Sequence, residues 1–308
     1  MMPASQRSTA SSDPPPGAFL QRRVEERTHP DWVAEARADP QTLYVVTRNS
    51  AHLVHHGSEP HIAFISPEAA ALLAPPDSQL TLLGWFRNRR CVLIQLPENS
   101  GFQPTGTAYE ELRPLLAPLP EDEAHLLTYV RALTIWRGRH RHCGVCGAPT
   151  APHSAGHVLT CTSCGTQFFP RIDPAIIVLV TDGTHALLGR QSAWPAGRYS
   201  ALAGFVEPGE SLEEAVAREV CEETGARVRS TRYFASQPWP FPASLMLGFH
   251  ARAPQEPIRL DGELEEARWF ELEQLRAERA PLLLPPPHTI ARRLIEAWMR
   301  QPEQDAPG

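Results

Sequence analysis

The sequence has no apolar run long enough to cross a bilayer. The longest near its centre, Ala175–Val180, falls far short of the ~18–20 residues that a membrane helix needs. Positive charge is not in excess either, since 29 basic residues face 35 acidic ones, so no polybasic field points to general nucleic-acid binding. Residues 1–17, rich in Ser and Pro, lack the apolar segment of a secretory signal and are expected to be disordered. We therefore expect a cytoplasmic protein, and exclude membrane and collagen-like classes.

Cysteine is also scarce, with six in 308 residues, which excludes a disulfide scaffold. Four of the six form two hooks, Cys143-x2-Cys146 and Cys161-x2-Cys164, with 14 residues between the hooks. Two such hooks present four thiolates to a tetrahedral Zn²⁺. Redox chemistry is the alternative, but thioredoxin-like CxxC motifs do not come in spaced pairs. The spacing predicts a zinc ribbon, and because four cysteines fill the coordination sphere the zinc should be structural.

The apolar pattern divides the chain around this ribbon. Upstream, short runs at 42–46, 61–65, 80–83 and 91–94 suit an antiparallel sheet, and a helix is expected over 121–137. Downstream, strands near 175–180, 186–188, 233, 244–249 and 267–270 and a helix over 289–299 suggest an α/β sandwich. The expected domains are a β-rich α+β domain over 18–140, the ribbon over 141–170, the sandwich over 171–300 and a tail over 301–308.

One acidic helix stands out in the sandwich. Ser211 and Glu214 form a capping box, so the helix should begin at Leu212, and Gly225 is suited to end it. Within it, three glutamates recur at i, i+3 and i+4 spacing and should lie on one face within ~5–6 Å of each other; these are Glu219, Glu222 and Glu223. Such a cluster is either a solvated acidic face or a site for a hard divalent cation, which prefers carboxylate oxygens.

The spacing Gly204-x5-Glu210-x7-Arg218-Glu219-Val220-x-Glu222-Glu223-x-Gly225 resembles the Nudix box, and only Ala226, where a larger aliphatic residue is usual, departs from it. The resemblance implies a Nudix α/β/α sandwich that uses Mg²⁺ or Mn²⁺ to hydrolyse a nucleoside diphosphate linked to another group. By the same match, Glu219, Glu222 and Glu223 are catalytic metal ligands, while Glu210 and Arg218 brace the loop and helix. The general base is Glu222, Glu223 or a carboxylate from a neighbouring loop.

Downstream of the box lies the segment Ser236-Gln-Pro-Trp-Pro-Phe-Pro-Ala-Ser244. Its alternating aromatics and prolines suit a stiff extended segment that stacks on flat rings, or alternatively a Pro-rich turn with a buried Trp. Together with the ribbon and the run over 284–295, it resembles the NADH pyrophosphatase family. That resemblance implies cleavage of NAD(H) into nicotinamide mononucleotide and AMP, removal of NAD caps from RNA 5′ ends, and a homodimer whose sites borrow groups from the partner.

The same resemblance implies a set of substrate contacts. Phe205 and Trp239 would stack on a ring, and Gln237 and Ser244 would bind polar groups of the substrate. The residues that would line the pocket are Phe169, Ala203 and Ala291. A further metal ligand is expected at Glu263, with Glu265 and Glu266 as neighbouring alternatives.

Two other functions remain open from the sequence. One is a Nudix pyrophosphatase acting on ADP-ribose, NDP-sugars or dinucleoside polyphosphates. The other is a non-catalytic zinc-ribbon protein that binds nucleic acid, for which the basic stretch Arg137–His142 could contact phosphates, although a solvated rim explains that stretch equally well.

Overall fold

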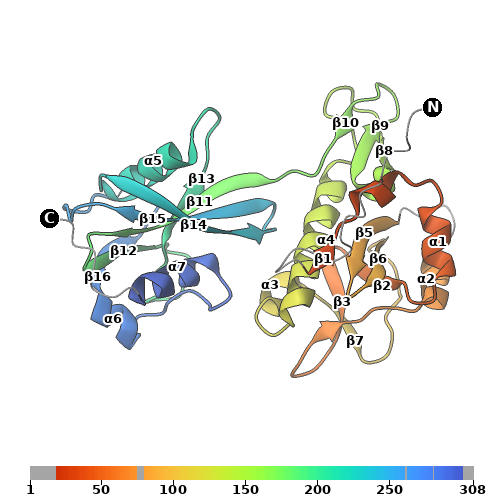
Figure 1. The fold of residues 1–308 in the computed structure, drawn as a ribbon, viewed down its shortest axis with the longest axis horizontal. Helices are drawn as coiled ribbons and strands as arrows, with labels where there is room; N and C mark the ends of the chain where they lie inside the picture. Colours follow the sequence, from red (N-terminus) through yellow and green to blue (C-terminus); the bar gives the residue numbers. More distant parts are fainter. Residues whose placement is uncertain (1–18, 75–79, 261, 280, 301–308) are drawn as a thin grey trace, which may run out of the picture. The chain divides into compact units, whose positions relative to one another are not determined.

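The computed structural model describes residues 19–74, 80–260, 262–279 and 281–300. The expected disorder over 1–17 and the tail over 301–308 lie outside this range. The chain forms two compact units, residues 1–170 and 171–308 (Figure 1). No helix among the described residues is both long and apolar enough to span a membrane.

The first unit is built on a seven-stranded sheet of order β1-β5-β6-β2-β3-β4, with β7 pairing β3. The strands are β1 (Leu20–Gln21), β2 (Leu43–Arg48), β3 (Ala51–His55), β4 (His61–Ile62), β5 (Thr81–Phe86), β6 (Arg89–Leu96) and β7 (Thr107–Glu110). Its helices are η1 (Val24–Thr28), α1 (Trp32–Ala38), α2 (Pro67–Leu73), α3 (Leu112–Leu115) and α4 (Glu121–Arg139).

The expectation of an antiparallel sheet is wrong at its centre, where β2 and β6 run parallel from the Leu43–Cys91 pair onward. A hairpin cannot join parallel strands, and here the connection contains β3, β4, α2 and β5. The sequence shows runs of apolar residues but not which runs pair, so direction was not readable from it.

Helix α4 closes one side of this unit. It extends two residues beyond the expected 121–137, and its core positions Leu126, Val130 and Leu133 are buried as expected. Glu123 on the same helix is 2% exposed; its carboxylate accepts a hydrogen bond from the Ile62 backbone N–H at 2.7 Å and lies 3.1 Å from Arg87. This buried carboxylate therefore fastens α4 to β4.

The ribbon belongs to the first unit and contains β8 (Thr150–His153), η2 (Ser154–Gly156), β9 (Val158–Cys161) and β10 (Gln167–Phe168). Its three strands are ordered β10-β9-β8. The ribbon is held on the larger sheet by His157, whose Nε2 donates to the Leu82 carbonyl at 2.7 Å. Gly156 makes this approach possible, because a Cβ there would lie 2.6 Å from the Thr81 hydroxyl.

The second unit has a six-stranded sheet of order β14-β15-β11-β12-β16, with β13 pairing β11. Its strands are β11 (Asp173–Thr181), β12 (His185–Arg190), β13 (Leu202–Phe205), β14 (Ser230–Trp239), β15 (Ser244–Arg252) and β16 (Glu266–Glu271). Helix α5 (Leu212–Thr224) covers one face, and α6 (Leu272–Ala277) and α7 (Ile290–Met299) cover the other (Figure 1).

Strand β11 explains the two layers, because its side chains alternate between the faces. Ile176 and Val178 pack with Val216 and Val220 of α5. Their neighbours, Ile177 and Leu179, pack with Leu294, Ile295 and Trp298 of α7. A strand buried on both faces has the unbroken apolar run seen in the sequence, and the expected α/β/α sandwich is confirmed.

Two buried histidines make the first unit sensitive to acid. His52 in β3 has no exposed surface, and burial lowers its pKa to about 3. Neither of its ring nitrogens has a hydrogen-bond partner among the described residues. Burial likewise lowers the pKa of His157 to about 4. Both rings are therefore neutral in the folded protein at pH 6.5, where an ordinary histidine is half protonated.

We predict that the free energy of unfolding falls as the pH is lowered from about 6.5 to 4. In that range the two histidine rings bind protons in the unfolded chain but stay neutral in the folded unit. Each histidine contributes a slope of about 1.4 kcal/mol per pH unit in that window. The substitution His52→Leu should lower the slope of the free energy of unfolding against pH by about the share of one histidine. Urea unfolding at pH 6, 5 and 4 measures that slope. His55→Leu, at the exposed end of the same strand, is the matched control. Equal slopes for wild type and His52→Leu would contradict the prediction.

Candidate active site and zinc centre

The acidic helix α5 forms as expected, with both hydrogen bonds of the Ser211–Glu214 capping box and a left-handed Gly225 (φ 76°) at its end. Its glutamates differ in exposure. The Glu222 side chain is 56% exposed and that of Glu219 only 13%, whereas Glu223 is buried at 3%. Glu219 and Glu223, four residues apart, are thus the two largely buried members of the cluster, and Glu222 is the exposed one.

Arg218 connects this helix to the preceding loop. Its Nε and Nη2 donate to the two carboxylate oxygens of Glu210 at 2.6 and 2.9 Å, and Nη2 also donates to the Phe205 carbonyl at 2.8 Å. Nη1 donates to Glu219 at 2.9 Å and to Glu222 at 3.2 Å. The Arg218 hydrogen bonds hold the pKa of Glu210 down to about 2. Glu210 and Arg218 thus brace the loop against the helix.

Glu219 lies at the centre of the acidic cluster. Burial raises the pKa of its carboxyl above the ordinary value, and the charges of Glu222 and Glu263 raise it further, against the opposing pull of Arg218. Glu265 and Glu266, the alternatives to Glu263 as a further metal ligand, have other partners. Glu265 forms an ion pair with Arg190, and Glu266 accepts a hydrogen bond from the Tyr199 hydroxyl at 2.6 Å. Of the three, Glu263 is the one whose charge is among the main influences that raise the pKa of Glu219.

Gly204 on β13 makes room for that carboxylate. A Cβ at Gly204 would stand 1.9–2.2 Å from the carboxylate atoms of Glu219, far inside contact distance. The sequence marks Gly204 as the first position of the box but does not reveal this contact, because it depends on how β13 and α5 pack. Any side chain at 204 would displace Glu219.

This donor set fits a hard divalent cation in chemical type, since it consists of carboxylate oxygens. The carboxylates are not gathered as tightly as the ribbon thiols, which are the one group of potential ligands among the described residues whose donor atoms all lie within 4.8 Å of each other.

The Pro-rich segment combines the two forms left open by the sequence, because residues 236–239 are the extended end of β14 and residues 240–243 form a turn. Strand β14 stops at Trp239, the chain turns over 240–243, and β15 starts at Ser244, which pairs with Trp239. Proline cannot donate to a ladder, so Pro240 and Pro242 favour the turn. Trp239 is half-buried, and its ring meets the edge of Phe241 at 5.1 Å between centroids.

Gln237 binds the chain itself. Its amide nitrogen donates to the His288 carbonyl at 2.8 Å, and its amide oxygen accepts from the Ile290 N–H at 2.8 Å. The side chain therefore fixes the first turn of α7 to β14, a role that sequence reasoning missed because 53 residues separate Gln237 from Ile290. Ala291, in the same turn, is 5% exposed and packs in the core, which leaves it little surface for a ligand.

The other residues that were predicted to contact the substrate differ in how far they are exposed. Phe205 is 58% exposed although it is large and apolar, and Ala203 on the same strand is half-buried. Ser244 is 9% exposed. Phe169 belongs to the first unit, where its ring is 63% exposed. The substrate roles of these residues stay predictions.

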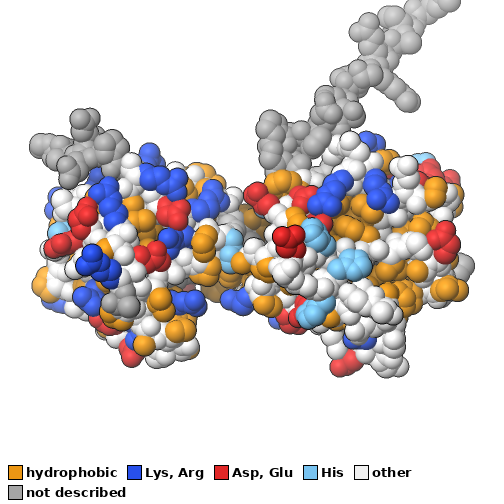
Figure 2. Space-filling model, turned by 90° about the horizontal axis from the view of Figure 1, so that it is seen from below, with side chains coloured by type: hydrophobic (Ala, Val, Ile, Leu, Met, Phe, Trp, Pro, Cys, Tyr) orange, Lys and Arg blue, Asp and Glu red, His pale blue; other side chains and the backbone are white. Residues whose placement is uncertain are grey.

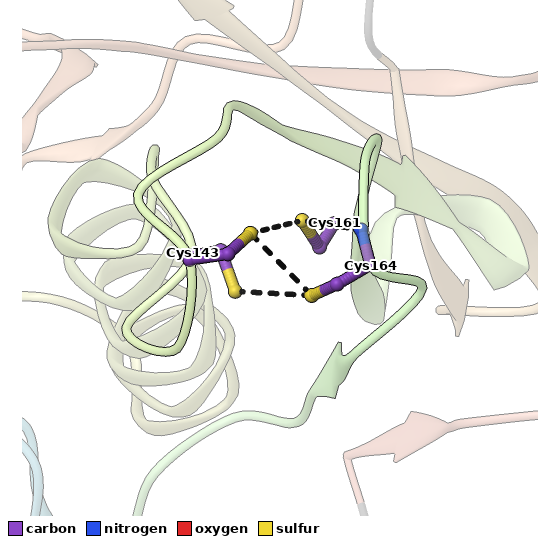
Figure 3. Close-up of side chains that lie close together, drawn as sticks. Cys143, Cys161 and Cys164 are labelled. Atoms are coloured by element: carbon purple, nitrogen blue, oxygen red, sulfur yellow. Dashed lines mark hydrogen bonds between the residues drawn. The ribbon is translucent and has the colours of Figure 1, made fainter.

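The four cysteines of the hooks come together in the first unit, as Figure 3 shows for Cys143, Cys161 and Cys164, whose sulfur atoms point toward one another. The Cys143–Cys164 and Cys146–Cys161 sulfur pairs are 3.6 and 3.4 Å apart. A tetrahedral ion with Zn–S bonds of about 2.3 Å needs sulfurs about 3.8 Å apart. The cluster therefore fits Zn²⁺, and with four thiol ligands it leaves no open position.

The backbone around the hooks favours thiolates. The N–H groups of Cys164 and Ser163 each donate to Cys161 Sγ at 3.4 Å and lower the pKa of that thiol. The hydroxyl of Thr166, 3.1 Å from Cys164 Sγ, is the largest of the hydrogen-bonding influences that lower the Cys164 pKa to about 6. Because zinc binds the thiolate form, these contacts prepare the site for metal.

Comparison with known proteins agrees with this geometry. Residues 171–294 match the NUDIX domain family, residues 139–169 the NADH pyrophosphatase zinc ribbon domain, and residues 41–136 the NADH pyrophosphatase-like rudimentary NUDIX domain. The three matches together run from β2 to α7.

Relatives of known name are similar over much of the chain. The protein named NAD-capped RNA hydrolase NudC from Stutzerimonas stutzeri is 43% identical over 66% of this chain and 73% of its own length. Its namesake from Mycobacterium bovis is 46% identical, over 61% of this chain and 64% of its own length. The human NAD-capped RNA hydrolase NUDT12 is 32% identical over 92% of this chain and 72% of its own length. On its zinc ribbon, its Nudix box and these similarities, the chain belongs to the NADH pyrophosphatase family of Nudix hydrolases.

Proposed function

We propose that this protein hydrolyses the pyrophosphate bond of NAD(H) to nicotinamide mononucleotide and AMP, and that it also removes NAD caps from RNA 5′ ends. The observation that carries the proposal is the set of carboxylates near the end of α5. Glu219 lies against Gly204, and the charges of Glu222 and Glu263 raise the pKa of Glu219. The relatives are named NAD-capped RNA hydrolases, and these names support the choice of substrate.

In this proposal Glu219, Glu222, Glu223 and Glu263 hold Mg²⁺ or Mn²⁺, which when bound neutralises pyrophosphate charge and makes a water more acidic. Water attacks one phosphorus, the bond from that phosphorus to the bridging oxygen breaks, and a carboxylate of the site takes the proton. Arg218 keeps Glu219 and Glu222 in position through its bonds to both. The candidates for this base are Glu222, Glu223 and a carboxylate from a neighbouring loop.

Trp239 and Phe205 are proposed to stack on the nicotinamide or the adenine ring. Support comes from the exposed ring of Phe205 and from the Trp239–Ser244 pair at the end of the hairpin. Gln237 acts in this proposal by holding α7 against β14.

We also propose that the protein is a cytoplasmic homodimer. The apolar side chain of Ile172 is 65% exposed, and a second copy would cover such surface. None of the six cysteines forms a disulfide, which supports a reducing compartment.

The proposal is tested by turnover of NADH, NAD-capped RNA, ADP-ribose and a diadenosine polyphosphate, measured side by side with Mg²⁺ and with Mn²⁺. We expect NADH and NAD-capped RNA to be preferred, and Glu223→Gln to lower kcat at least about 100-fold, because losing a ligand removes several kcal/mol of transition-state stabilisation. Circular dichroism should show that the variant is folded. Near-wild-type activity of Glu223→Gln, or preference for ADP-ribose, would refute the assignment.

Gly204→Ala should lower kcat strongly while changing the free energy of unfolding little. The added methyl displaces the Glu219 carboxylate, which is the far end of a flexible side chain and can move without disturbing the core. Steady-state kinetics and urea unfolding measure the two effects. Gly57→Ala, where a Cβ meets nothing within 4 Å, is the control, and a Gly204→Ala enzyme with unchanged kcat would show that the contact has no catalytic importance.

Cys143→Ser should lose the zinc and destabilise the first unit, because metal ligation is coupled to folding. Zinc content by elemental analysis and thermal unfolding provide the measurement. Cys221→Ser, at an exposed cysteine of α5, is the matched control and should keep both zinc and melting temperature. A zinc-free Cys143→Ser protein that melts like wild type is the result that would disprove a structural role.

A further inference from the structure

A cavity of about 840 Å³ lies inside the first unit, where the ends of β2 and β6 meet α4 and the zinc ribbon. Its volume falls within the range of small-molecule binding sites, which is about 300–1,000 Å³. Thr47 and Gln95 line the cavity from the two strands, Thr134 and Arg137 from the helix, and Arg141 from the start of the ribbon. No residue of the acidic cluster or of the zinc centre lines it.

The polar side chains of the cavity come from one face of the sheet and from the helix that covers this face. Val46 packs in the core beside α1 and α2, and alternation along β2 turns the next residue, Thr47, to the opposite face, on the side of α4 (Figure 1). Gln95 is the partner of Thr47 in the parallel pairing of β2 with β6, so it lies on the same face. Thr134 and Arg137 are three residues apart on α4 and share one side of the helix.

Two hydroxyl groups of this cavity are buried and have no hydrogen-bond partner among the described residues. They are Oγ1 of Thr47 and Oγ1 of Thr134, in residues that are 1% and 7% exposed. A buried polar group without a partner costs folding free energy, and most such groups in proteins are paired. Each hydroxyl can donate one hydrogen bond and accept others. A ligand in the cavity would supply the partners that the protein does not.

Arg137 gives the cavity wall its charge. The residue is 8% exposed, and its Nη1 donates to the hydroxyl of Thr81, which is fully buried. Burial lowers the pKa of Arg137 to about 10, so the guanidinium stays positive at neutral pH. The other charged residues of the lining, Arg141 and Glu98, are exposed and of opposite sign. Because solvent screens exposed charges much more than buried ones, the cavity favours an anion.

The outer surface of the unit has a different charge pattern. On the face of the first unit seen at the right of Figure 2, basic side chains lie beside acidic ones. Neighbouring exposed charges of opposite sign offset each other in solvent. Attraction of an anion to this unit therefore depends on the cavity more than on that face.

The zinc ribbon and β6 complete the wall. The Thr150 hydroxyl donates to the His140 carbonyl at 2.6 Å, and the Thr150 N–H donates to the Arg141 carbonyl at 3.0 Å, which ties the ribbon to the end of α4. Part of the lining is apolar and comes from Ile94 and Leu96 of β6 and from Pro152 and Leu159 of the ribbon. The cavity thus suits a molecule that has an apolar or flat body as well as an anionic group.

We propose that this cavity binds the oxyanion group, a phosphate or a carboxylate, of a small organic molecule. Arg137 supplies the positive charge, the hydroxyls of Thr47 and Thr134 donate to the oxyanion, and the apolar part of the wall holds the rest of the ligand. The inference is independent of the proposed hydrolysis of NAD(H), because every residue of this site belongs to the first unit and none belongs to the acidic cluster.

The test is calorimetric titration of the full chain with AMP, inorganic phosphate and citrate, with adenosine as the uncharged comparison and no added Mg²⁺ or Mn²⁺. Thr47→Val and Thr134→Val should each weaken binding of the oxyanion about tenfold, since a hydrogen bond to a charged group contributes about that much. Neither variant should lower the free energy of unfolding of the unliganded protein, because the lost hydroxyl has no protein partner there. Thr42→Val is the matched control, because its hydroxyl is also buried without a partner in the described chain but Thr42 does not line the cavity.

The exposed charge at the cavity is tested separately. Arg141→Gln should weaken binding about threefold, as expected for an exposed charge. Arg139→Gln removes the same charge from an exposed residue outside the lining and should leave the affinity unchanged. Titrations at two salt concentrations check that the difference between these variants is electrostatic.

The outcomes separate the possible ligands. Binding of AMP or of phosphate that is weakened in both threonine variants supports the site and identifies a phosphate ligand, whereas the same pattern for citrate alone supports it and identifies a carboxylate ligand. Equal affinity of wild type, Thr47→Val and Thr134→Val for these anions would place them elsewhere on the protein and overturn the inference. Failure of all three anions to bind at millimolar concentration, or binding of adenosine as tight as that of AMP, would overturn it as well.

Discussion

The guanidinium of Arg218 is the contact on which the acidic site depends. Its five hydrogen bonds to Glu210, Glu219, Glu222 and the Phe205 carbonyl equal the number of N–H groups that a guanidinium has. Glutamates one turn apart on a helix repel each other, and the positive group between them offsets that repulsion. A lysine offers three donors on one nitrogen and could not connect loop, strand end and helix in this way.

Much of this site could be predicted from sequence because its signals are local. The Ser211–Glu214 capping box, the Gly225 stop and the two cysteine hooks each act over a few residues, so spacing alone determines what they form. What could not be predicted depends on packing between distant segments. The burial of Glu223, the contact of Gly204 with Glu219 and the parallel pairing of β2 with β6 all follow from tertiary structure.

The two units use glutamate on a helix in different ways. In the first unit, Glu123 of α4 is buried and is engaged by the Ile62 backbone and Arg87, so it serves the fold. In the second unit, Glu222 of α5 keeps more than half of its side chain in solvent. The first unit matches a rudimentary version of the domain that the second unit matches in full, and this difference in carboxylate use fits that description.

The double hydrogen bond of Gln237 has a consequence for the architecture of the second unit. It joins the aromatic hairpin to the start of the last helix, two segments that the chain separates by β16, α6 and their loops. The two hydrogen bonds thus hold the hairpin and the last helix side by side. The start of α7 is therefore positioned against β14 by a direct contact as well as by the chain that leads to it.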